Sequence, residues 1–170
     1  MEVQSTSYSV VILTAYHSIS GELSLHDQRF SDFLNDRRDT TVNLRDAQVA
    51  RLVEPGKVLQ RHSEASIAKA CILLAFEPRQ QAISAAGRLY GFVKKQTHEV
   101  FLVLDNMEVR GTLHTTGPLD LRRTLATAGE SFLPLTKAVI RLCTNDRYLI
   151  EQDAVMVNAH LIRYIAKIEL

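Results

Sequence analysis

The residues of this chain with the clearest chemical potential are a His–Asp pair. His26 is followed directly by Asp27. A carboxylate beside an imidazole can orient the ring and raise its pKa, as a general base requires. Successive residues of a strand point to opposite faces, however, so within a strand these two side chains would not bond each other. We therefore expect His26 and Asp27 to have structural or surface roles, and we expect no catalytic residue and no enzyme.

Two pairs of arginines form the second candidate site. One pair directly follows a predicted short helix and the other lies inside a second one: Arg37 with Arg38, and Arg122 with Arg123. Guanidinium groups suit bidentate contact with phosphate, so these residues fit an RNA-binding rim. Acidic residues accompany each pair, so a solvated surface of compensating charges explains the same pattern. Together with Asp27, these four arginines are the residues that we expect to contact RNA or a protein partner.

Other kinds of functional site lack their sequence signatures. The chain has no glycine-rich phosphate loop, no C-x-x-C pair and no H-E-x-x-H motif, and its six histidines have no ligand spacing. Its two cysteines, Cys71 and Cys143, do not make a disulfide framework, and Cys71 lies in an apolar run that predicts burial. We therefore expect no metal and no cofactor.

Charge and hydropathy narrow the choice of partners. A formal net charge of +1 gives no field strong enough to gather nucleic acid or an anionic membrane by long-range attraction. No apolar run approaches the ~20 residues that span a bilayer. Residues 1–9 lack the basic-then-apolar order of a signal peptide. We expect a cytoplasmic protein that makes no membrane contact and associates with itself or with another protein.

Core-type residues and glycines recur along the chain at a spacing of 90 or 91 positions. At 90 positions the pattern Val10, Gly21, Leu23 returns as Val100, Gly111, Leu113, and at 91 positions Leu34, Leu44, Ala47 returns as Leu125, Leu135, Ala138. Polar residues between these positions mostly differ, as happens when two copies of one fold share only their packing. We predict two repeats, residues 7–76 and 97–170, joined by a packed connector over residues 77–96.

Each predicted repeat has the same succession of elements. An apolar strand, a turn and an alternating strand precede a short helix, capped by Ser31 in the first repeat and by Asp120 in the second. Gly21 and Gly111 lie inside the alternating strands, where glycine usually marks a bend or a close backbone approach. A third strand follows, and each repeat then ends in a long apolar strand, over residues 67–76 and 154–165. We also expect a polar loop over residues 54–64 and, in the connector, a helix over residues 80–86.

Short motifs in both repeats resemble the Sm-like (Hfq-type) family of small β-barrels. Residues 21–27 read G-E-L-S-L-H-D and residues 44–47 read L-R-D-A, which fit the G-x-L-x-x-x-D and L-x-D-A runs of that family. The second repeat keeps G-T-L at 111–113 and L-T-K-A at 135–138, with a glycine where Asp27 stands in the first. The resemblance implies an SH3/Sm-like barrel and RNA contact through Asp27. The inserted helix departs from the family's tight loop.

These observations predict a mainly β protein made of two tandem SH3/Sm-like small barrels, each with a short inserted helix. Small bent barrels expose strand edges whose unpaired N–H and C=O groups invite pairing with another chain. We therefore expect a non-enzymatic binding or scaffolding protein that acts through edge-strand assembly. The alternative is an Sm-like RNA-binding protein that uses the rim carrying the helices.

Overall fold

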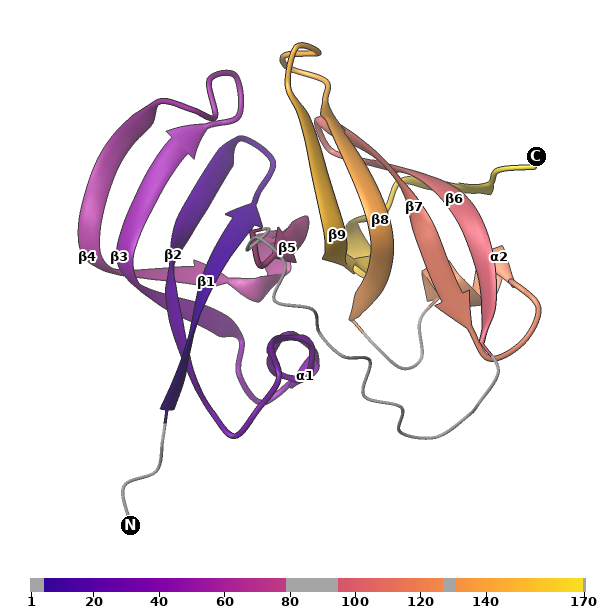
Figure 1. Cartoon of the computed structure of the whole chain (residues 1–170), viewed down its shortest axis with the longest axis horizontal. Coiled ribbons are helices and arrows are strands. Elements are labelled where there is room, and N and C mark those ends of the chain that lie inside the picture. Colours follow the sequence, from indigo (N-terminus) through magenta and orange to yellow (C-terminus); the bar gives the residue numbers. More distant parts are fainter. Residues whose placement is uncertain (1–4, 79–94, 127–130, 170) are drawn as a thin grey trace.

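The computed structural model describes residues 5–78, 95–126 and 131–169, and this part of the chain is mainly β (Figure 1). Among these residues, all strand pairings are antiparallel and form one ten-stranded sheet in the order β10-β6-β7-β8-β9-β5-β1-β2-β3-β4. The strands are β1 (Ser5–Leu13), β2 (His17–His26), β3 (Thr41–Arg51), β4 (Val58–Ala68), β5 (Leu74–Phe76), β6 (Gln96–Leu104), β7 (Met107–Thr115), β8 (Phe132–Leu142), β9 (Leu149–Asn158) and β10 (Tyr164–Lys167). The helices are α1 (Phe30–Asn35) and α2 (Leu121–Ala126), with 3-10 turns η1 (Lys69–Cys71) and η2 (Ala159–Leu161).

The same order of elements occurs in a first half, residues 5–76, and in a second half, residues 96–167. In each half the last short strand returns to pair with the first one, β5 with β1 and β10 with β6. Neither half closes into a barrel among the described residues. The last strand of the first half, β5, pairs with β9 of the second half and not with β4, and β9 in turn does not pair with β10. The prediction of a mainly β protein is confirmed, and the two halves form one open sheet in place of two separate closed barrels.

A glycine bends the second strand of each half. A Cβ atom at Gly21 would lie 2.8 Å from the Arg45 carbonyl oxygen, and the register of β2 against β3 shifts at this point. Opposite, Asp46 has a φ of 50°, in the left-handed region. The second half repeats the arrangement with Gly111 and Lys137, whose φ is also 50°. The predicted close approach of another backbone at both glycines is confirmed.

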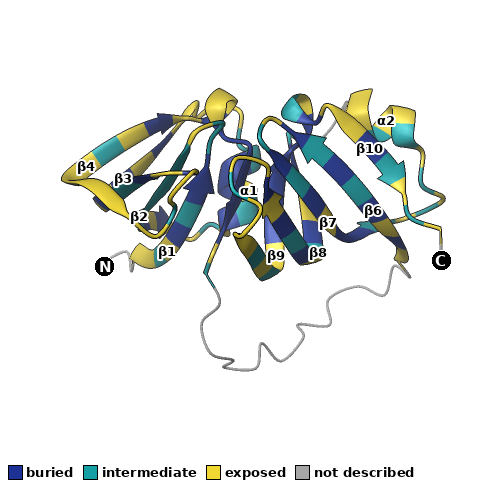
Figure 2. Cartoon of the chain, turned by 90° about the horizontal axis from the view of Figure 1, so that it is seen from above, coloured by how far each residue is buried: buried dark blue, intermediate teal, exposed yellow. Residues whose placement is uncertain are grey.

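The two halves share their hydrophobic cores. Phe132 and Met156 of the second half belong to the core cluster of the first, and Leu74 and Phe76 of the first half belong to the cluster of the second. Buried positions continue through the strands where the halves meet (Figure 2). Since burial of apolar surface contributes roughly 25 cal/mol per Å², this exchange makes the two halves stabilise each other. Phe30, Phe33 and Phe132 are buried, as their apolar surroundings in the sequence predict.

The end of each half differs from the prediction. The single strands expected over residues 67–76 and 154–165 are each interrupted by a 3-10 turn, η1 or η2. The reason is topological, since the chain must turn between the hairpin that it leaves and the first strand to which it returns. The polar loop expected over residues 54–64 is also shorter, because β4 already begins at Val58.

Helix ends agree with the prediction in one half only. Asp120 caps α2, since its Oδ1 accepts a hydrogen bond from the Arg123 N–H at 3.0 Å. The α1 helix begins at Phe30 with Arg29 as its N-cap and has no side-chain cap, so the prediction of Ser31 as the cap is wrong. Most of the connector, with the helix predicted over residues 80–86, lies outside the described residues.

Candidate interaction site

The pairing of β5 with β9 is the backbone link between the two halves; we call it the joint. Leu74 lies opposite Val157 and Ala75 opposite Met156, and the Asn158 N–H donates to the Leu73 carbonyl at 2.9 Å. Figure 1 shows the two strands side by side at the centre of the molecule. The joint is therefore an edge-to-edge strand contact that the protein already makes within one chain.

Asn35 clamps the joint from α1. Its Nδ2 donates to the Phe132 carbonyl at 3.2 Å, and its Oδ1 accepts from the Phe132 N–H at 2.8 Å. The amide thus satisfies both the N–H and the C=O of Phe132 at the start of β8. Phe132 itself is 2% exposed. These two hydrogen bonds fix α1 of the first half against β8 of the second.

Lys69 connects the same helix to the turn that precedes β5. Its Nζ donates to the carbonyls of Phe33 at 2.6 Å and Asp36 at 3.0 Å, and it lies 4.4 Å from the centre of the Phe33 ring. Burial lowers the pKa of Lys69, against the opposing influence of Asp39 and Asp36. The lysine caps carbonyls at the C-terminal end of α1, where a positive charge is favourable.

Asn158 completes the network from the second half. Its Nδ2 donates to the Ile72 carbonyl at 2.9 Å and to the Lys69 carbonyl at 3.4 Å, while its Oδ1 accepts from the His160 N–H at 3.1 Å. The side chain is buried, so a partner for each of its polar atoms matters to stability. Two further asparagines of the second half donate to carbonyls of the first: Asn106 to Ala15 at 2.6 Å and Asn145 to Val53 at 3.0 Å.

The counterparts of the joint strands are the two ends of the sheet, β4 and β10, which we call the outer edges. Within the described residues, each has a partner strand on one side only. The correspondence is geometric: the Lys69 N–H at the end of β4 donates to Thr40 at 2.9 Å, and the Ala159 N–H at the end of β9 donates to Ser131 at 2.8 Å. Ser66 lies three residues before Lys69, and Met156 lies three residues before Ala159. Ser66 of β4 therefore corresponds to Met156 of β9.

The outer edges differ chemically from the joint. Where β9 has buried Val155, Met156 and Val157, β4 has residues 65–67 with the sequence A-S-I, of which only the isoleucine is buried. By position, the clamp residue Asn35 corresponds to Ala126 of α2, and Asn158 corresponds to Ala68. The outer edges therefore offer backbone hydrogen-bonding groups without the amide side chains that seal the joint.

The structure leaves the predicted contact residues separate from one another. Asp27 is exposed at the end of β2 with a φ of 50°. The two arginine pairs are exposed, but α1 and α2 lie well apart in both views of the chain (Figures 1 and 2). Arg37 and Arg38 therefore form no single patch with Arg122 and Arg123.

Carboxylates lie near both arginine pairs, and Asp36 compensates the charge of Arg38 directly. Arg38 binds both carboxylate oxygens of Asp36, at 2.7 and 3.0 Å, and thereby holds the pKa of that carboxyl well below its usual range. Arg122 and Arg123 extend from α2 near Asp120, whose carboxylate caps the helix. The interpretation of Arg38 as part of a compensated surface is supported by this geometry.

Two smaller observations concern cysteines and metal ligands. Cys71 and Cys143 are free and exposed, so the prediction that Cys71 is buried is wrong, since the thiol lies on the η1 turn and not in a strand. Among the described residues, no group of three or more His, Cys, Asp or Glu side chains is placed to hold a metal ion. Nor does the described part of the chain contain a helix that is long and apolar enough to cross a membrane.

No protein-family model, curated protein or solved structure matches the chain. The resemblance to Sm-like proteins therefore stays a prediction that rests on the motifs around Gly21 and Leu44. The residues of the joint that sequence reasoning missed are Asn35, Lys69 and Asn158. Their types carry no signal by themselves, because asparagine and lysine are ordinary surface residues until the fold places them.

Proposed function

We propose that the protein is a cytoplasmic, non-enzymatic scaffold that assembles with further copies of itself by pairing β10 of one copy with β4 of the next. The observation that carries this proposal is the joint, in which β5 of the first half already pairs with β9 of the second. The strand β10 corresponds to β5, and β4 corresponds to β9. In this proposal each half is a small barrel-like repeat, and the same contact recurs between chains.

The joint supplies the register of the proposed contact. Since Ala75 lies opposite Met156 in the joint, its counterpart Ile165 would lie opposite Ser66 of the next copy. The Ser66 N–H points toward the open side of β4. The Lys69 N–H, three residues later, donates to the carbonyl of Thr40 just before β3. Because successive N–H groups of a strand point to alternate sides, the Ser66 N–H points away from β3. An unpaired strand edge of this kind is a template for another strand.

The proposed contact between chains should be weaker than the joint, because alanines stand where the joint has its two asparagines. Without counterparts of Asn35 and Asn158, the interface rests on backbone pairing and on a few apolar contacts around Ile67 and Ile165. Arg61, His62 and Glu64 further make β4 a polar edge. Association is therefore reversible and dependent on concentration. A head-to-tail contact repeated between identical chains closes into a ring when its rotation allows, and otherwise extends as a filament.

The test is the solution mass, measured by light scattering across a concentration series, of the natural protein and of two variants at Ser66. Ser66→Pro removes the outward N–H while leaving the pairing of β4 with β3, and proline is tolerated on an edge strand. Ser66→Ala is the matched control, since it removes only the hydroxyl, which donates to Asn43. We expect multiples of the 19.1 kDa chain for the natural protein and for Ser66→Ala, but a single-chain mass for Ser66→Pro. A single-chain mass for all three at every concentration contradicts the proposal.

The alternative proposal is RNA binding through the exposed arginines of the helix-bearing rim. Its support is the exposure of Arg122 and Arg123 on α2, with a resemblance to Sm-like proteins. An RNA binder has an affinity for oligonucleotides that falls steeply with salt. Replacement of both α2 arginines by glutamine then reduces that affinity, whereas the self-associating scaffold keeps its mass in the same variant.

A further inference from the structure

A groove of about 750 Å³ lies next to the joint, between the parts of β1 and β9 that β5 does not connect. It is lined by residues 7–9 of β1, residues 29–31 before and within α1, residues 75–78, and residues 152–156 of β9. Within the described residues, β5 pairs with β1 only from Val11 to Leu13 and with β9 only at Met156 and Val157. Both walls of the groove are therefore strand edges without a partner strand among the described residues.

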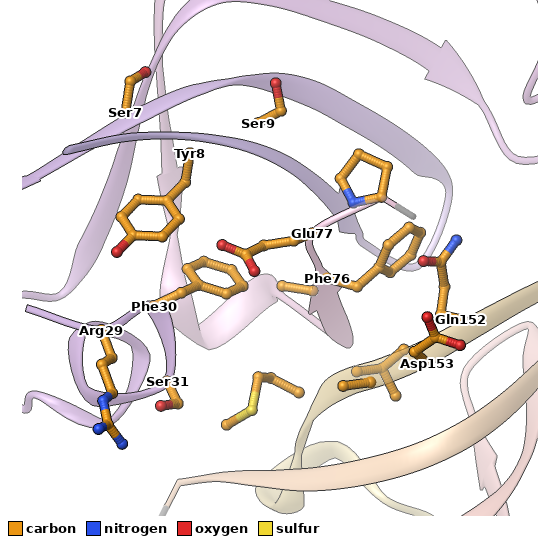
Figure 3. Close-up of a pocket in the computed structure, with 15 residues that line it drawn as sticks. Ser7, Tyr8, Ser9, Arg29, Phe30, Ser31, Phe76, Glu77, Gln152 and Asp153 are labelled. Carbon is orange, nitrogen blue, oxygen red and sulfur yellow. The ribbon is translucent and has the colours of Figure 1, made fainter. Parts of the chain in front are cut away.

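The floor of the groove is aromatic. The side chains of Ser7 and Ser9 in β1 donate hydrogen bonds to Glu22 of β2, on the face of the sheet that points away from the groove. Because successive side chains of a strand point to opposite faces, Tyr8 between them points toward the groove. Figure 3 shows the rings of Tyr8, Phe30 and Phe76 around its centre. Such ring faces attract cations through their quadrupoles.

One carboxylate stands at the centre of this floor. Glu77 directs its carboxyl group toward the rings of Tyr8 and Phe30 (Figure 3), and burial raises its pKa. Among the described residues, Glu77 has no hydrogen-bond or ion-pair partner, and none of their basic side chains compensates its charge. Arg29 also lines the groove, but its guanidinium points away from Glu77 (Figure 3). Asp153 adds a second carboxylate on the β9 side.

We infer that this groove binds an extended peptide segment of a protein partner that carries a lysine or arginine side chain. The backbone of the segment pairs with the open edge of β1 or β9, as in other cases of strand addition. The basic side chain lies over Tyr8 and Phe30 and is neutralised by Glu77. The groove is distinct from the outer edges, so this inference does not depend on self-association.

The experiment is a titration of the full chain with blocked octapeptides of alternating serine and threonine, followed by amide chemical shifts. Three peptides carry a single central arginine, lysine or glutamine. We expect shifts at residues 7–9 and 152–154, with the arginine or lysine peptide binding about fivefold more tightly than the glutamine peptide, as expected for a partly exposed ion pair with an aromatic contact.

Protein variants separate the role of the carboxylate from general binding. Glu77→Gln should weaken the basic peptides about fivefold and leave the glutamine peptide unchanged. Glu54→Gln is the control, because Glu54 is an exposed carboxylate in the turn before β4 and outside the groove. Equal affinity for the three peptides, equal effects of the two variants, or no shift at either strand edge would each overturn the inference. Ser66→Pro, which blocks the outer edge, should leave these titrations unchanged.

Discussion

Ser66 and Met156 occupy the same position in the two halves, and of these two only Met156 has a partner strand beyond its own hairpin among the residues that the structure describes. Met156 lies opposite Ala75 in the joint and is buried, whereas Ser66 is exposed on the outer edge. One chain therefore contains both an occupied and an open version of the same edge. This difference is the physical basis of the proposed assembly.

The clamp between Asn35 and Phe132 is expected to be a major stabilising contact of the joint. Asn35→Ala removes both hydrogen bonds and leaves the N–H and C=O of Phe132 without these partners. Unsatisfied buried groups cost about 1–3 kcal/mol each, so we expect the free energy of unfolding to fall by about 2–3 kcal/mol in urea titrations. Asn43→Ala, at an exposed position of β3, is the control. Equal stability of the two variants would mean that the clamp contributes little.

The two bend glycines should differ in their tolerance of a methyl group. At Gly21 a Cβ would lie 2.8 Å from the Arg45 carbonyl oxygen, and at Gly111 the nearest atom is the Thr136 carbonyl oxygen at 3.2 Å. We expect Gly21→Ala to be destabilised by about 1–3 kcal/mol, and Gly111→Ala by less, in thermal or urea unfolding. The reverse order would show that the β2–β3 crossing relaxes more readily than the β7–β8 crossing.

Glu77 should make stability depend on pH in an identifiable direction. Burial raises its pKa in the folded chain above the ordinary value of 4.5, so the folded state binds more protons than the unfolded state in the window between the two pKa values. The contribution of Glu77 to stability is therefore present below pH 4.5 and is lost as the pH rises through the raised pKa. Glu77→Gln should gain stability relative to the natural protein as the pH rises above 4.5. An identical pH profile for both proteins would show that the carboxylate is fully solvated.

Local features of the fold were predictable from the sequence because they depend on neighbouring residues. The recurrence of Gly21 as Gly111 marked both bends, and Asp120 marked the start of α2. The ends of the two halves were not predictable in this way, because an apolar run such as residues 67–76 does not reveal where the chain must turn to reach an earlier strand. Cys71 was misplaced for the same reason.

The joint itself could not be predicted from local pattern. Asn35 and Phe132 are separated by 97 residues, and neither residue type indicates which strand edges meet. The groove around Glu77 follows from the joint, since it exists only where β1 and β9 separate. The charge compensation of Arg38, by contrast, was predictable from the sequence, because its acidic partner Asp36 lies only two residues away.

The most direct test of the proposed assembly is amide hydrogen exchange at Ser66 as a function of protein concentration. In an isolated chain the Ser66 N–H faces away from β3 and should exchange rapidly, while in the assembly it donates to Ile165 of another copy and should be protected. We expect exchange at Ser66 to slow as concentration rises, with no change at Ala65, whose N–H already faces β3. The same rate at Ser66 at every concentration would contradict assembly through this edge.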